Sequence, residues 1–336
     1  MSDPRALLAP IRAMHDRARD EIVAATERAH VDALAAVDRD AESDTIYAID
    51  VAGEDVVTRF AGELARTQTF VLVAEGLAGG SCAYPREGAT ADWRIIVDPI
   101  DGTRGLMYQK RSAWILTAVA PDRGAGTSLR DVVLAVQTEI PLVKQHLSDQ
   151  VWVVRGEGAL AVRYNRLTGE RTPLRLGPSR APGIAHGFAT VARFFPGARD
   201  ELAAIDEAIV YRALGSYAPG KAHCFEDQYA STGGQLYELM AGHDRWVADL
   251  RPLLRPVLER RGLPPALTCH PYDICCASIA EACGVIVTDV HGEPLDVPLT
   301  VDAEVAWVGY ANEQIRAQIE PLFQHELRAR GWIDVR

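Results

Sequence analysis

Apolar residues near the start of the chain recur every three or four positions, whereas later ones form short unbroken runs. The first pattern predicts one or two amphipathic helices within residues 5–38 and a further helix over residues 53–66. The unbroken runs favour buried strands. Strands are expected at residues 70–74, 93–97, 112–120 and 132–140.

Turns rich in glycine separate the strands of the first half, with no regular helices between them. A loop of small residues is expected at 76–91, and residues 151–155 and 159–164 flank Gly156 and Gly158 as a hairpin. This Gly-x-Gly spacing also fits a dinucleotide-binding fingerprint, but no helix follows it, so the hairpin is the better interpretation. The first half is therefore predicted to be α+β.

A segment rich in proline, glycine and serine, residues 176–187, predicts a boundary between two halves, 1–180 and 181–336. Helical spacing dominates the second half. Helices are expected at 200–209, 225–241, 272–283 and 312–330, with a strand at 285–288 and a turn at His291-Gly292.

Composition narrows the class of protein. With 48% hydrophobic and 24% charged residues among 336, the chain has ample material for a core. No run approaches the roughly 18 apolar residues of a membrane helix, and the first residues lack the apolar stretch of a secretory signal. We therefore expect a soluble protein without a membrane partner.

The net charge of −11 disfavours a nucleic acid polymer as a partner. Most of the six cysteines lie late in the chain within apolar sequence, which favours reduced thiols over a disulfide framework. A cytoplasmic location is expected. An acidic chain binds phosphate only with local help from metal ions, backbone N–H groups or a few cationic side chains.

Two carboxylates three residues apart end the strand predicted at 93–97. Pro99 bends the chain after Asp98, and Asp101 follows two residues later. Mg²⁺ prefers oxygen ligands in octahedral geometry, and this bend offers both carboxylates together with the backbone carbonyl of Ile100. The segment is thus a candidate metal site.

The next two residues, Gly102 and Thr103, can present backbone N–H groups to a phosphate, as tight turns and helix N-termini do. The same residue types are also common in ordinary turns for local reasons. From this segment alone, both interpretations remain open.

The run Asp98-Pro99-Ile100-Asp101-Gly102-Thr103 resembles the D-P-x-D-G-[TS] signature of the inositol monophosphatase family, which belongs to the lithium-sensitive, metal-dependent phosphatase superfamily. A second motif of that family is similar to Tyr272-Asp273 and to the segment from Glu281 to Asp296. Tyr272 stands where the family has Trp, and Cys283 where it has Gly.

Two upstream segments extend the resemblance. Glu75, at the end of an apolar run, resembles the family's G-E-E metal ligand, and residues 44–50 resemble its D-x-V-T-x-x-D segment. The similarity covers about residues 5–330, with an insertion around 242–270. It implies a layered α/β/α/β/α sandwich and a homodimer.

The resemblance also implies a hydrolase that uses Mg²⁺, two or three ions, to cleave a small phosphorylated metabolite such as an inositol phosphate or a sugar phosphate. Glu75, Asp98, the Ile100 carbonyl and Asp101 would hold the first metals, and Asp101 and Asp273 would flank a second.

In the same scheme, Glu75 and the Thr103 hydroxyl orient a metal-activated water, and Asp50 orients Thr103 without itself contacting the metal. Gly102 and Thr103 bind the phosphate. Taken singly, Asp273 is more typical of a helix N-cap, Glu75 of a loop and Asp50 of a solvated surface, so the inference depends on their joint occurrence.

The chain departs from the family pattern at three places. The family's lysine has no counterpart in residues 37–42, where Arg39 is the basic residue; Tyr47 replaces a threonine; and Gly76 replaces the second glutamate. These departures leave the number of metal ions, two or three, open. In the insertion region and just before it, Arg245 and Glu238 are expected to bind the non-phosphate part of the substrate.

Other functions remain as alternatives. A 3′(2′),5′-bisphosphate nucleotidase is a close variant, whereas the missing lysine and Tyr47 favour a non-catalytic metal-binding relative. The group Cys269, His270, Cys275 and Cys276 lacks a C-x-x-C pair, which disfavours zinc. The two residues between Asp98 and Asp101 also argue against the Asp-x-Asp phosphatases that form an aspartyl-phosphate.

Overall fold

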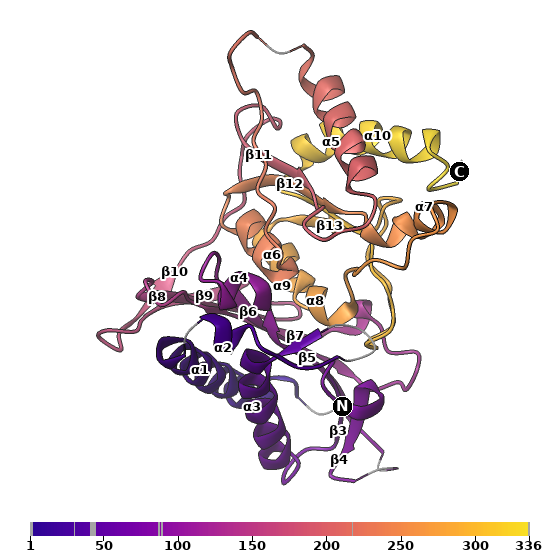
Figure 1. The fold of residues 1–336 in the computed structure, drawn as a ribbon. Helices are drawn as coiled ribbons and strands as arrows, with labels where there is room; N and C mark the ends of the chain where they lie inside the picture. Colours follow the sequence, from indigo (N-terminus) through magenta and orange to yellow (C-terminus); the bar gives the residue numbers. More distant parts are fainter. Residues whose placement is uncertain are drawn as a thin grey trace.

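The chain folds into five layers of helices and sheets (Figure 1). The structure is a computed structural model and describes residues 3–29, 31–40, 45–86, 88, 90–216 and 218–334. Three residues of the predicted first-loop and upstream motifs, Ala41, Glu42 and Asp44, lie outside the described residues. No helix in the described ranges has the length and apolar content needed to cross a membrane.

The first layer contains α1 (Arg5–Arg28) and α3 (Ala48–Leu64), which pack against an eight-stranded sheet. The short α2 (Val31–Leu34), β1 (Val37–Asp40) and β2 (Thr45–Tyr47) connect them, and β1 pairs with β2. The sheet order is β10-β9-β8-β7-β6-β5-β3-β4. Its strands are β3 (Phe70–Val73), β4 (Ser81–Tyr84), β5 (Trp93–Asp101), β6 (Ala113–Pro121), β7 (Leu134–Ile140), β8 (Leu147–Val154), β9 (Leu160–Asn165) and β10 (Arg171–Leu174).

A second, four-stranded sheet has the order β11-β12-β14-β13. Three helices, α6, α8 and α9, lie between the two sheets, and α5 and α10 cover the far side (Figure 1). The strands are β11 (Phe188–Val191), β12 (Asp244–Asp249), β13 (Ile286–Thr288) and β14 (Trp307–Tyr310). The helices are α4 (Thr103–Met107), α5 (Arg199–Leu214), α6 (Thr232–Met240), α7 (Arg255–Arg260), α8 (Pro271–Ile274), α9 (Ala277–Cys283) and α10 (Glu313–Ala329).

The central strands of the first sheet are buried on both faces, which explains their unbroken apolar runs. Adjacent residues point to opposite faces of a strand. Ile95 therefore packs with α1 and α3, whereas its neighbour Ile96 packs with the helices between the sheets. On β6, Ile115 likewise packs with α1 and α3, and Leu116 packs with the helices between the sheets. The expected layered α+β sandwich is confirmed. The predicted division at 180/181 falls in the connection between β10 and β11.

Three predicted segments differ from the structure. The helix expected over 225–241 begins only at Thr232, because the Ser231 hydroxyl caps it by accepting the N–H of Gly234 at 2.9 Å. The loop expected at 76–91 contains the edge strand β4. The region taken as an insertion begins with β12, an interior strand of the second sheet whose Trp246 is fully buried.

The expected hairpin is confirmed, because β8 and β9 pair antiparallel around Gly156, which has a φ of 88°. All six cysteines are free thiols in the structure.

A buried histidine ties the first helix to the first sheet. His15 of α1 contacts the hydroxyl oxygens of Thr117 on β6 at 2.8 Å and Thr138 on β7 at 2.9 Å. Burial, with the charges of Arg19 and Arg12, lowers the pKa of His15 from 6.5 to about 3. The folded protein therefore keeps this ring neutral.

We predict that His15 makes folding sensitive to acid. Because the pKa of His15 is lower in the folded state, its contribution to the free energy of unfolding is fully present above pH 6.5. This contribution falls by about 1.4 kcal/mol per pH unit as the pH drops toward 3. Urea unfolding of wild type and His15→Gln at pH 7.5 and pH 5.5 checks this. The stability advantage of wild type should shrink at the lower pH, and an unchanged advantage would contradict the assignment.

Candidate metal centre

Asp98 and Asp101 project from the end of β5, where the pairing register with β6 shifts between them. The Asp98 carboxylate accepts the backbone N–H of Ile100 at 2.9 Å. Gly102 then turns the chain into α4 with a φ of 96°, and a Cβ at this position would lie only 2.9 Å from the Cβ of Ser231. The segment is a tight turn, and the same turn directs two carboxylates into a shared cavity.

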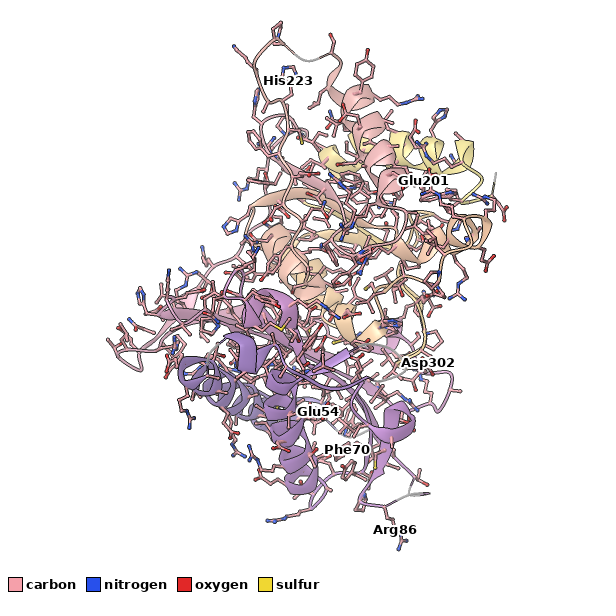
Figure 2. The ribbon with its side chains drawn as sticks, viewed as in Figure 1. Glu54, Phe70, Arg86, Glu201, His223 and Asp302 are labelled. Carbon is pink, nitrogen blue, oxygen red and sulfur yellow. The ribbon has the colours of Figure 1, made fainter. Side chains whose placement is uncertain are left out.

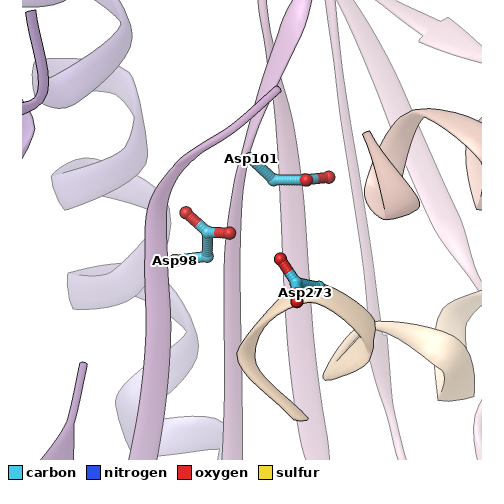
Figure 3. A group of neighbouring side chains, drawn as sticks. All are labelled: Asp98, Asp101 and Asp273. Carbon is cyan, nitrogen blue, oxygen red and sulfur yellow. The ribbon is translucent and has the colours of Figure 1, made fainter. Parts of the chain in front are cut away.

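Asp273 reaches this cavity from α8, between the sheets. Its carboxylate accepts the N–H of His270 at 2.6 Å, so it is the third residue of the helix and His270 is the N-cap. The N-cap interpretation of Asp273 is therefore wrong by three positions. One oxygen from each of Asp98, Asp101 and Asp273 lies within 4.8 Å of the others (Figure 3).

Asp101 is also held by the first turn of α6. Its Oδ2 accepts the Ser231 hydroxyl at 2.7 Å and the Gly233 N–H at 2.6 Å, and its Oδ1 accepts the Thr232 N–H at 3.3 Å. This approach requires a glycine, because a Cβ at Gly233 would lie 2.9 Å from Asp101 Oδ2 and 2.7 Å from Leu116. The helix N-terminus thus fixes the Asp101 carboxylate and stabilises its charge.

The three carboxylates destabilise one another's charges. Burial, followed by the charges of Asp101, Asp273 and Glu75, raises the pKa of Asp98 well above its ordinary value. Burial and Asp101 do the same to the pKa of Asp273. Burial raises the pKa of Asp101 to about 6, although the hydrogen bonds from α6 oppose this rise. A divalent cation would offset the repulsion, and a set of carboxylate oxygens suits a hard ion such as Mg²⁺.

The other predicted residues of the site line the same cavity. Glu75 follows β3, which runs parallel to β5, and Thr103 begins α4. The Thr103 hydroxyl oxygen lies 2.8 Å from Asp50 Oδ1 and 2.9 Å from the Ile100 carbonyl. Since a hydroxyl has one hydrogen, it donates to one of the two at a time.

The structure does not bring Glu238 and Arg245 into this cavity. Glu238 lies toward the end of α6, where it accepts a hydrogen bond from Arg111 at 3.0 Å and contacts His243. Arg245, on β12, donates to the carbonyl of Gly183 at 2.9 Å and to that of Ala185. Both side chains bind neighbouring segments of the fold.

Several residues of the cavity wall were not predicted. Arg104 follows Thr103 directly, and its guanidinium lies 4.9 Å from the ring centre of Phe195. Arg251, which is buried, stacks at 4.4 Å over Phe194 and donates from Nε to Asp249 at 2.9 Å. The signal for Arg104 was its position beside the motif. Nothing local marked Phe194 or Phe195.

We predict that Gly233→Ala disrupts the centre, because the new methyl group displaces either α6 or the Asp101 carboxylate. Overpacking of this kind costs about 1–3 kcal/mol. Thermal unfolding and calorimetric titration with Mg²⁺ should show lower stability and weaker binding. Gly158→Ala is the matched control, since a Cβ there meets nothing within 4 Å. Equal effects of the two substitutions would contradict the prediction.

A second prediction concerns the protein without metal. Because the pKa values of Asp98 and Asp273 are raised in the folded state, ionisation of these carboxyl groups destabilises the fold. Their contribution to the unfolding free energy is fully present below about pH 3.8 and is lost as the pH rises through the folded-state pKa. Asp273→Asn should therefore raise the unfolding free energy of metal-free protein at pH 8 by about 1 kcal/mol. The gain should vanish near pH 4, and Mg²⁺ should stabilise wild type more than the variant. Chemical unfolding with a chelator or with Mg²⁺ measures both effects.

Comparison with known proteins finds similarity in structure. No protein-family model matches the sequence, and neither does any curated protein. The extragenic suppressor protein SuhB of Bartonella henselae superposes with a TM-score of 0.63 at 15% identity, over 95% of this chain and 98% of that one. Fructose-1,6-bisphosphatase of Leishmania major superposes with a TM-score of 0.67 at 14% identity, over 97% of this chain and 96% of that one.

An inositol monophosphatase of Zymomonas mobilis gives a TM-score of 0.59 at 16% identity, over 97% of this chain and 99% of that one. The match in each case extends over nearly the whole of both chains. The chain has the same layered α+β fold as these solved structures, among them an inositol monophosphatase.

Proposed function

We propose that this protein is a Mg²⁺-dependent phosphomonoesterase acting on a small phosphorylated metabolite, an inositol phosphate or a sugar phosphate. The observation that carries the proposal is the convergence of Asp98, Asp101 and Asp273, from segments far apart in the chain, to within 4.8 Å. A scaffold has little physical need for three carboxylates so close together, two of them buried. Among the structural neighbours are proteins named as phosphatases.

The residues around the cavity fit the expected metal. Asp98, Asp101, Asp273, Glu75 and the carbonyl of Ile100 would hold two or more ions. Bound Mg²⁺ would supply charge neutralisation for the phosphoryl group and a more acidic water molecule. Phosphoryl transfer needs mainly positioning and electrostatic stabilisation, so carboxylates, metal and backbone N–H groups suffice.

The chain's own groups would then orient the reactants. Asp50 accepts the Thr103 hydrogen, which leaves the hydroxyl oxygen free to accept a hydrogen from the attacking water. Glu75, which follows the neighbouring strand β3, would take up the proton that the water loses. The backbone N–H groups of Gly102 and Thr103 would bind the phosphate oxygens.

The cavity wall bears on the choice of substrate. Phe194 and Phe195 could stack against a nucleotide base, but the guanidinium groups of Arg251 and Arg104 already lie over these rings. The wall thus presents cations as well as aromatic carbon. A phosphate-release panel should contain inositol monophosphates, sugar mono- and bisphosphates and an adenosine 3′,5′-bisphosphate.

We predict Mg²⁺-dependent phosphate release from at least one member of this panel, and its loss in Asp98→Asn. Loss of a metal ligand costs several kcal/mol of transition-state stabilisation, so this substitution should lower kcat/KM by about 100-fold or more. Asp92→Asn, a control at an exposed position just before β5, should retain activity. Full activity of Asp98→Asn would end the proposal. Metal binding without activity on any member would favour the non-catalytic relative.

A further inference from the structure

Gly76 stands where the resemblance leads one to expect a second glutamate, and the structure shows what fills its place. A Cβ at Gly76 would lie 2.4 Å from Glu54 Oε1 and 2.7 Å from Glu54 Cδ. Cβ atoms do not come so close to other atoms, so the Glu54 carboxylate occupies the space that a side chain at position 76 would need. The backbone of Gly76 is not in the left-handed region, so its conformation does not require glycine. A side chain at position 76 would instead force the Glu54 carboxylate to move.

The position of Glu54 follows from the packing of α3. Residues four apart share a face of a helix, so Glu54 lies on the same side as Asp50, which contacts Thr103. Between them, Gly53 lets the helix approach the metal-site turn, since a Cβ there would lie 2.9 Å from the Cβ of Pro99. Glu54 thus lines the cavity that contains the aspartate cluster, and Figure 2 labels it on α3.

Glu75 connects this position to the aspartate cluster. It lies next to Gly76 in the chain, and Glu75 and Glu54 line the same cavity. Its charge contributes to the raised pKa values of Asp98 and Asp273. The cavity therefore has two glutamates on its β3 side, one from the chain after β3 and one from α3.

We propose that Glu54 supplies, from a different element, the carboxylate that the chain lacks at position 76, and that Glu54 and Glu75 together bind the outermost divalent ion of the site. This inference rests on the proposed function, because it assumes that the aspartate cluster binds metal. Mg²⁺ and Mn²⁺ retain several waters when only one or two carboxylates bind them, so this ion is the most hydrated and the weakest bound.

The test is a titration of metal-free protein with Mn²⁺, followed by calorimetry and by the electron paramagnetic resonance signal of free Mn²⁺. Glu54→Gln should remove the weakest binding event or weaken it by about 10–100-fold, while the tighter binding stays unchanged. Asp55→Asn, an exposed neighbour on the same helix, removes the same charge and should titrate like wild type.

Two further variants separate position from charge. Gly76→Ala keeps every carboxylate but pushes Glu54 aside, so it should weaken the same event. The double variant Glu54→Ala/Gly76→Glu moves the carboxylate to the β3 side and should restore it. Thermal unfolding confirms that each variant is folded.

The outcomes distinguish this inference from the proposed function. If Glu54→Gln and Gly76→Ala both titrate like Asp55→Asn, the inference is overturned, although loss of the tight binding in Asp98→Asn would still support the metal site. If wild type hydrolyses no phosphate ester but Glu54→Gln loses the weak ion, the proposed function fails and the inference stands.

Discussion

Repulsion among three neighbouring carboxylates, two of them buried, is the constraint around which this fold is arranged. Asp98, Asp101 and Asp273 come from two different segments of the chain. Asp101 and Asp273 raise the pKa of Asp98, and Asp101 also raises that of Asp273. Such a cluster persists only if the surrounding elements hold it firmly. Here β5 fixes two members by its turn, the short helix α8 fixes the third, and the first turn of α6 binds Asp101.

The parts of the site that the sequence predicted are those with a local signature. The turn from Asp98 to Thr103 and the position of Asp273 before an apolar helix can be recognised from residue types and spacing. Strands with unbroken apolar runs were recognised for the same reason, because burial on both faces leaves no polar alternation. Their pairing into a single sheet could not be derived from periodicity.

What was missed depends on contacts between distant segments. Strand β12, which begins and ends with aspartates, was taken as part of an insertion because it lies among the extra residues between the family matches at Glu238 and Asp273. Those aspartates are buried, and Asp249 is paired with Arg251. Gly233 and Gly76 give no local signal either, since each leaves room for a side chain that arrives from elsewhere, Asp101 in one case and Glu54 in the other.

The position of α6 between the two sheets links the charge of the centre to the packing of the whole molecule. Its first turn binds Asp101, while its other residues contact both β6 of the first sheet and β12 of the second. Binding or removal of metal at the centre therefore acts directly on a helix that contacts both sheets. Slower amide exchange along α6 and β12 in the loaded protein, with little change in α1, would be the signature of a centre that also acts as a clamp between layers.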